Sequence, residues 1–99
     1  MTLDAAVNDY LDQITRTRPW TLAREQHVLH QFCGWLGTQP VRVTLDAVSP
    51  IFATNYARDH RLSRNERDEL VMALHNLCLW ANCHGLIGHN PFSLVTLVC

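Results

Sequence analysis

The sequence predicts an all-α fold, a compact bundle of four helices, and three observations lead to this expectation. Apolar residues recur at helical spacing in four separate stretches of the chain. Residues typical of helix ends stand between these stretches: Pro19, Pro40, the pair Ser49-Pro50, and Ser63. The one segment that alternates like a strand, VRVTLDAV, has no second strand to pair with, so we expect an extended connector.

The first two helices are predicted on either side of the segment TRTRPW. The first helix carries its apolar residues on one face, at Leu3, Val7, Tyr10, Leu11 and Ile14. Pro19 ends that pattern, and Thr21 is a suitable N-cap for the second helix. The apolar face of the second helix runs through Leu22, Val28, Leu29, Phe32, Cys33 and Leu36.

The last two helices have clear start signals. Ser49-Pro50 predicts the N-cap and first residue of a third helix, which we expect from Ile51 to about Asp59. Ser63 followed by Glu66 has the spacing of a capping box and begins a fourth helix over 64–84. The core face of this helix comprises Leu70, Ala73, Leu74, Leu77, Trp80 and Ala81.

The end of the fourth helix is also encoded locally. Gly85 can adopt the positive φ that closes a helix, and Leu86 and Ile87 can fold back onto its last turn. Asn90-Pro91 then predicts a short final turn or a fifth helix in FSLVTLV.

Composition limits the class of protein. A chain of 99 residues with 47% hydrophobic and 17% charged residues is expected to form one domain, neither disordered nor membrane-spanning. No leader opens the sequence and its four cysteines have no paired spacing, so we expect a cytoplasmic protein with reduced thiols.

The charges are unevenly placed. The net charge is −1, which excludes a broad electrostatic attraction for nucleic acid. All eight basic residues are arginines and precede Val71, whereas residues 71–99 carry no charged side chain. This uncharged part must be largely buried or covered by a partner.

Sites for chemistry or metals are not expected. The set Cys78, Cys83, His84 and His89 departs from the shorter ligand intervals of zinc sites, so neither metal nor cofactor is predicted. Packed thiols are the simpler interpretation of Cys33 and Cys78. There is no phosphate loop, nucleophile motif or acidic pair, and hence no small-molecule substrate.

Two stretches together resemble one family. The second helix has the pattern T…L..F..WL, with Thr21, Leu29, Phe32 and Trp35-Leu36. The stretch LSRNERDELVMALHNLCLWANCHGLIGHNPF has a Leu-Ser cap, then Trp-Ala, Gly-Leu-Ile and Asn-Pro in that order. This set resembles the N-terminal core-binding (SAM-like) domain of phage-integrase-type tyrosine recombinases, over Leu3 to about Val95.

The resemblance implies a function in DNA integration or recombination. It implies that 1–99 is a single core-binding domain, an N-terminal fragment of a larger recombinase whose catalytic domain is absent. Such a chain is not itself an enzyme, and Tyr10 and Tyr56 are not nucleophiles. The expected partners are double-stranded DNA, around which the domain forms one half of a clamp, and other recombinase subunits. The expected location is cytoplasmic and nucleoid-associated, in a protein of bacterial or phage origin.

Candidate DNA-binding residues gather at two helix beginnings, where free N–H groups and arginines favour phosphate. They are Arg16, Arg18, Thr21 and Arg24 at the second helix, and Arg61, Ser63, Arg64, Arg67 and His75 at the fourth. The resemblance carries over Thr21, Arg24, Arg64, Arg67 and His75. We expect the two beginnings to lie side by side.

Two alternatives remain open. Any single arginine is equally well explained by a solvated face or an intrahelical ion pair, and Glu66, Asp68 and Glu69 predict micromolar or weaker DNA binding. The chain can also be a stand-alone or degenerate protein–protein interaction module without DNA binding. Met72 and Leu79, on the outward face of the fourth helix, favour that alternative.

Overall fold

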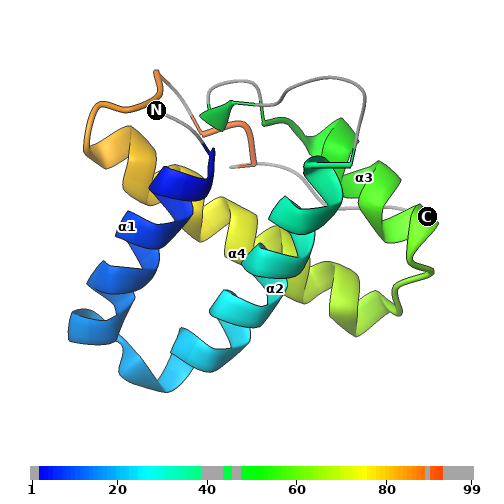
Figure 1. Cartoon of the computed structure of the whole chain (residues 1–99), viewed down its shortest axis with the longest axis horizontal. Coiled ribbons are helices and arrows are strands. Elements are labelled where there is room, and N and C mark those ends of the chain that lie inside the picture. Colours follow the sequence, from blue (N-terminus) through cyan, green and yellow to red (C-terminus); the bar gives the residue numbers. More distant parts are fainter. Residues whose placement is uncertain (1–2, 39–43, 46–47, 89, 93–99) are drawn as a thin grey trace.

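The chain folds as an all-α bundle, as the sequence predicts. Its structure, a computed structural model, describes residues 3–38, 44–45, 48–88 and 90–92. The helices are α1 (Leu3–Thr17), α2 (Leu22–Leu36), α3 (Pro50–Asp59) and α4 (Arg64–Cys83), and a short 3-10 turn, η1 (Pro19–Thr21), joins the first two. In Figure 1, α1 and α2 form an open V with η1 at its apex, and α4 crosses both.

The core lies where one face of each helix meets the others. Its fully buried side chains include Val7 and Ile14 from α1, Leu29 and Phe32 from α2, and Leu70, Leu74, Leu77 and Cys78 from α4. The predicted core face of α4 is buried apart from Trp80, which is only half-buried. The Trp80 indole N–H donates to the Gln13 side chain of α1, so the polar edge of the ring has a partner at the surface.

The two local end signals of α4 are confirmed. The Ser63 hydroxyl accepts from the Glu66 amide at 3.2 Å, and the Glu66 carboxylate accepts from the Ser63 amide at 3.0 Å. At the other end, Gly85 has φ 72°, and the Leu86 amide donates to the Ala81 carbonyl at 2.9 Å. These bonds form a capping box and a Schellman motif, so both ends satisfy their own backbone groups.

Thr21 is the N-cap residue of α2, as predicted, but its side chain forms no capping hydrogen bond. Thr21 occupies the N-cap position, but its φ and ψ of −99° and −7° are helical, because η1 runs directly into α2. The hydroxyl therefore turns inward and donates to Glu25 Oε2 at 2.9 Å instead of accepting from a free amide. Ser49 likewise precedes α3 without a side-chain cap bond.

The Asn-Pro-Phe exit is anchored on α4. Asn90 Nδ2 donates to the His75 carbonyl at 3.2 Å, and the Phe92 side chain is 2% exposed. Of the predicted connector, the structure describes Thr44, Leu45 and Val48, and the last two are buried. The predicted final turn or fifth helix in FSLVTLV lies outside the described residues, apart from Phe92. Within the described ranges, no helix is long and apolar enough to cross a membrane.

Candidate nucleic-acid interface

The two arginine-bearing helix beginnings are not side by side, contrary to the expectation from sequence. Helices α2 and α4 run in opposite directions: Glu25, near the start of α2, is bonded to Asn76, whereas Gln31 further along α2 shares a hollow with Glu66. Arg64 and Asn76 are roughly 18 Å apart along α4 at a rise of ~1.5 Å per residue. The two beginnings are therefore separate surfaces.

The start of α2 holds its arginines in contacts within the protein. Arg18 Nη2 donates to the Tyr10 hydroxyl at 3.1 Å and lies 3.9 Å from Glu25 Oε2. Arg24 Nε lies 4.0 Å from the Glu69 carboxylate of α4. Arg16, at the end of α1, pairs with Asp12 at 3.1 Å across one exposed helical turn. Each of these side chains would have to leave an acidic partner or share it in order to bind phosphate.

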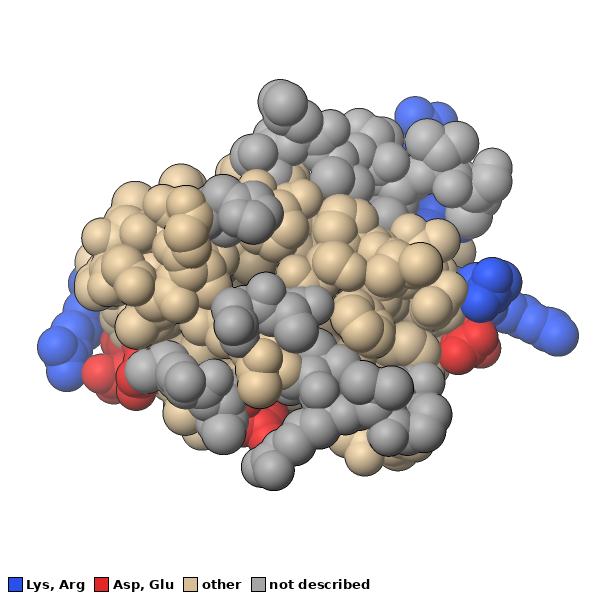
Figure 2. Space-filling view, turned by 90° about the horizontal axis from the view of Figure 1, so that it is seen from above, with Lys and Arg blue, Asp and Glu red and all other residues tan. Residues whose placement is uncertain are grey.

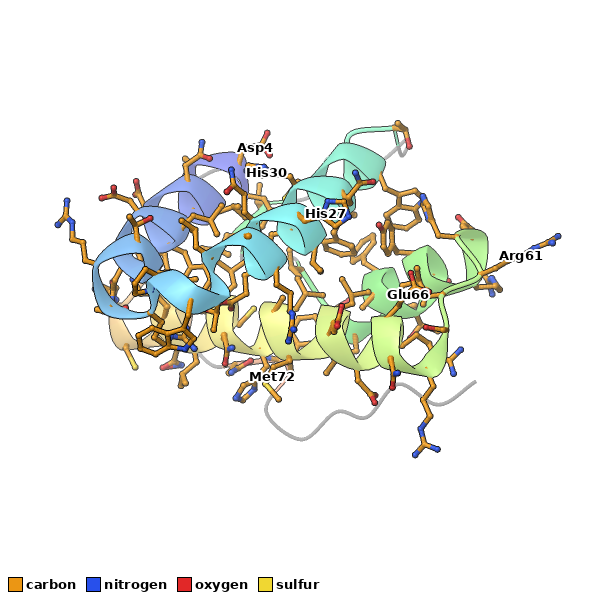
Figure 3. The ribbon with its side chains drawn as sticks, turned by 90° about the horizontal axis from the view of Figure 1, so that it is seen from below. Asp4, His27, His30, Arg61, Glu66 and Met72 are labelled. Atoms are coloured by element: carbon orange, nitrogen blue, oxygen red, sulfur yellow. The ribbon has the colours of Figure 1, made fainter. Side chains whose placement is uncertain are left out.

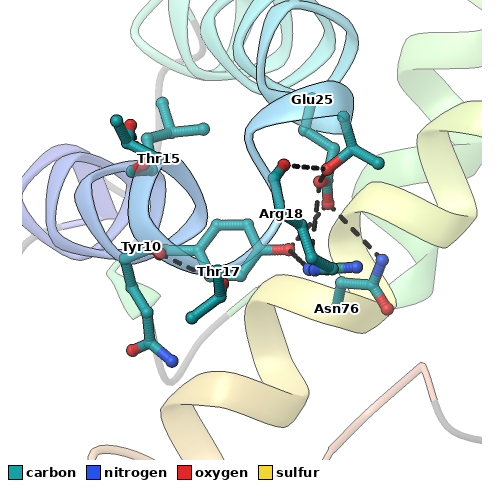
Figure 4. Close-up of polar contacts among 9 residues, drawn as sticks. Tyr10, Thr15, Thr17, Arg18, Glu25 and Asn76 are labelled. Atoms are coloured by element: carbon teal, nitrogen blue, oxygen red, sulfur yellow. Dashed lines mark hydrogen bonds and ion pairs between the residues drawn. The ribbon is translucent and has the colours of Figure 1, made fainter.

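Glu25 is the polar residue that the sequence analysis missed. It is 6% exposed, and its carboxylate accepts from the Tyr10 hydroxyl at 2.6 Å and from Asn76 Nδ2 at 3.4 Å. Figure 4 shows this group, with Arg18 bonded into it, where α1, α2 and α4 meet. The Thr21 hydroxyl also donates to the Glu25 carboxylate. Burial, followed by the bond to Glu25, raises the pKa of Tyr10, so Tyr10 remains a proton donor to the carboxylate.

A signal for Glu25 was present in the sequence. Glu25 stands three residues after Leu22 and four before Leu29, on the apolar face of the second helix. A carboxylate at such a position is buried, and a buried carboxylate needs donors from neighbouring elements. The identity of those donors could not be read from the sequence, because Asn76 lies 51 residues away.

The turn between α3 and α4 has a different character. Three exposed arginines, Arg58, Arg61 and Arg64, surround it, and we name this group the α3–α4 corner. None of the three forms an ion pair with another described residue; Arg58 donates only to the neutral Asn55 side chain, at 2.9 Å. Figure 3 shows Arg61 pointing away from the body of the molecule at this turn.

Arg61 has an unusual backbone conformation. Its φ is 49°, and it is the only residue other than glycine with positive φ in the described part of the chain. The Leu62 amide donates to the Ala57 carbonyl at 3.0 Å and the Arg61 amide to the Arg58 carbonyl at 3.2 Å, which is a Schellman end for α3. Glycine is the usual residue at this position, so an arginine here carries a conformational cost.

The other candidate DNA-binding residues of α4 already have partners within the protein. The Glu66 carboxylate already accepts from the N-terminal amide of Ser63, so an acidic group stands where a phosphate would bind. The Arg67 guanidinium is half-buried and donates to the Leu62 carbonyl at 3.3 Å. His75, also half-buried, lies against the Asn90 side chain, with its Nδ1 3.3 Å from Asn90 Nδ2.

The surface as a whole is not broadly basic. Figure 2 shows arginine side chains projecting at both ends of the molecule, with acidic side chains next to them. Trp20, in η1, is 78% exposed and stands between the helices that carry Arg16 and Arg24. The face in Figure 2 and the net charge of −1 offer no large uniform positive field, so attraction for a phosphate would have to come from local contacts.

The described residues contain no group of three or more histidine, cysteine or acidic side chains placed to hold a metal ion. His89, one of the four residues considered from sequence, lies outside them. Cys78 is buried and Cys33 half-buried, and burial raises the pKa of both thiols to about 12. Cys83 is exposed. Cys33 and Cys78 therefore behave as packed thiols, as predicted.

Comparison with known proteins adds no relative. Neither the models of protein families, nor the curated proteins, nor the solved structures give a match to this chain. The resemblance to core-binding domains therefore rests on the sequence motifs.

Proposed function

We propose that this chain is a DNA-binding domain of the core-binding type, which grips duplex DNA by phosphate contacts and has no bond chemistry of its own. In that role it would serve a tyrosine recombinase or integrase whose catalytic domain acts on the bound DNA. The ordered motifs at Thr21, Ser63 and Asn90-Pro91 support the family, and the all-α bundle is compatible with it.

The observation that carries the proposal is the α3–α4 corner. Its three arginines are exposed and have no acidic partner among the described residues, whereas Arg16, Arg18 and Arg24 each have one. A guanidinium without a partner can bind a phosphate without first breaking an internal ion pair. The corner is therefore the principal phosphate contact in this proposal, and the start of α2 is secondary.

The number of free arginines sets the expected strength of binding. Three phosphate contacts give a slope of about −2.7 for the logarithm of the association constant against the logarithm of salt concentration. Glu66 and Asp68 lie within one helical turn of Arg64 and oppose the phosphates. We therefore expect weak binding, micromolar or weaker, that does not depend on DNA sequence.

The proposal is tested by fluorescence anisotropy with a labelled 20-base-pair duplex at low salt. The triple variant Arg58→Gln/Arg61→Gln/Arg64→Gln should abolish binding, while its far-ultraviolet circular dichroism stays helical. The matched control is the double variant Arg16→Gln/Arg24→Gln, which removes two exposed arginines that have acidic partners and should weaken binding less per charge removed. Unchanged binding by the triple variant would refute the proposal.

The assignment to a recombinase has its own test. The reading frame that follows the codon for Cys99 should encode the arginine, histidine and tyrosine residues of the catalytic domain. A duplex-binding domain that is followed by an unrelated sequence would leave the DNA-binding proposal in place and remove the recombinase assignment.

A further inference from the structure

The outward face of α4 borders two neighbouring hollows. One, of about 480 Å³, lies between α2 and α4 and has Val28, Met72 and Ala73 among its lining residues. The other, of about 290 Å³, lies between the end of α1 and α4 and includes Leu79. Arg18 and Asn76 line both hollows, so the two are neighbours along α4, and we name the pair the α4 groove.

Two large apolar side chains of α4 are exposed in the α4 groove. Met72 is 59% exposed and Leu79 is 48% exposed, although both belong to a helix that is otherwise well packed. They are seven residues apart, which is two helical turns or roughly 10 Å along the axis. Figure 3 shows Met72 on the side of α4 that faces away from the core.

Among the acidic and arginine side chains that line the groove, Asp68 is the one that lacks a partner of opposite charge in the described part of the chain. Arg24 pairs with Glu69, and Arg18 is bonded into the Glu25 group. Asp68 remains: it is exposed, lines the groove one helical turn before Met72, and pairs with no cation of the described residues. The groove therefore combines an apolar floor with one uncompensated carboxylate at its end.

The walls of the groove determine which kind of segment can fit. Both walls are helices whose mid-helix backbone groups are already bonded within the helix, so they offer no N–H or C=O to an extended peptide. A segment that docks there must satisfy its own backbone, and a helix does so. Apolar side chains seven residues apart on such a helix match Met72 and Leu79.

We propose that the α4 groove binds an amphipathic helix of a partner protein, with two apolar residues seven apart and an arginine or lysine one turn beyond, opposite Asp68. The apolar residues cover Met72 and Leu79, and the cation pairs with the carboxylate. The groove is distinct from the α3–α4 corner, so this inference holds whether or not the corner binds DNA.

The test is a selection from a phage-displayed library of 16-residue, alanine- and glutamine-rich helical peptides, randomised on one face, against the full 99-residue chain. Enriched peptides should carry apolar residues seven apart and a basic residue four positions from one of them. A synthetic copy of an enriched peptide is then titrated against variants of the chain by fluorescence anisotropy.

The variants separate the groove from the rest of the surface. Met72→Gln and Leu79→Gln should each weaken peptide binding about tenfold or more, through lost apolar burial. Asp68→Asn should weaken it about two- to fivefold. The control is Ile51→Gln on α3, another apolar residue that is 64% exposed, and it should leave binding unchanged.

Four outcomes would overturn the inference. In the first, the parent chain enriches no peptides in the selection beyond those enriched by the Met72→Gln/Leu79→Gln variant; in the second, an enriched peptide binds that variant as tightly as the parent in the titration. The other two outcomes are weaker peptide binding by the Ile51→Gln variant, and unchanged binding of a peptide that carries a central proline. If Met72→Gln and Leu79→Gln weaken duplex DNA binding and no peptide is enriched, the groove is a DNA contact and the inference is wrong. Thermal unfolding of each variant shows whether the fold is intact.

Discussion

If the α3–α4 corner binds DNA as proposed, a substitution of Arg61 should change stability and DNA binding in opposite directions. Its φ of 49° is a conformation in which an L-residue costs roughly 1–2 kcal/mol. Arg61→Gly removes that cost, but glycine gains unfolded-state freedom worth about 0.5–1 kcal/mol. The difference predicts a variant that is more stable by about 0.5–1 kcal/mol, which corresponds to a rise in Tm of roughly 2–8 °C for a domain of this size.

The same substitution removes one of the three arginines of the α3–α4 corner. If each arginine holds one phosphate, the slope of affinity against salt should fall in magnitude by about 0.9. Thermal unfolding followed by circular dichroism measures the first effect, and anisotropy over a series of salt concentrations measures the second. We therefore expect Arg61→Gly to be the more stable and the more weakly binding protein.

Arg61→Ala is the matched control. Alanine removes the same cation but keeps a Cβ at positive φ, so its DNA binding should equal that of Arg61→Gly, whereas its Tm should stay close to that of the parent. A Tm for Arg61→Gly at or below that of Arg61→Ala would refute the argument from backbone strain. Equal DNA affinity of all three proteins would show that Arg61 contacts no phosphate.

Three further predictions concern the helix ends and the thiols. The pKa of Glu66 is lowered because its carboxylate accepts hydrogen bonds from Ser63. The stabilising effect of the carboxylate is therefore present above the ordinary carboxyl pKa and is lost as the pH falls through the folded-state value. Urea unfolding should show that Glu66→Gln lowers stability relative to the parent less at pH 3 than at pH 7. Gly85→Ala should lower stability by roughly 1 kcal/mol, measured by urea unfolding, because φ is 72° although no atom lies within 4 Å of the added Cβ. In a Cys99→Ser background, thiol labelling at pH 7 should modify Cys83 alone, since the pKa of Cys33 and Cys78 is raised to about 12; mass spectrometry of two or three labels would contradict their burial.

The features that sequence predicted well are those encoded by neighbouring residues. The Ser63 capping box and the Gly85 helix end each depend on side chains within a few positions, so local chemistry determines them. The positive φ of Arg61 had no such signal, because the sequence HRLS contains no glycine at the end of α3. It arises because Leu62 must turn back towards Ala57 before the cap of α4 begins.

The relation between helices was harder to predict than the helices themselves. Two arginine-bearing beginnings look equivalent in sequence, but α4 runs along α2 in the opposite direction. The partners of Arg18 and Arg24, Glu25 and Glu69, become visible only when that direction is known. Trp80, which the sequence places on the core face of the fourth helix, packs against the core but is only half-buried, and its indole N–H donates to Gln13 of α1.

The direction of α4 has one consequence for function that the composition does not suggest. Because the start of α2 faces the middle of α4, Glu69 neutralises Arg24, and the Glu25 group takes up Arg18. The arginines without an acidic partner among the described residues stand at the start of α4, beside Arg61, and Met72 and Leu79, from the uncharged stretch after Val71, line the α4 groove. Because α2 and α4 cross in opposite directions, a chain of net charge −1 has both a small cationic corner and a groove with exposed apolar side chains. The two surfaces are suited to different partners.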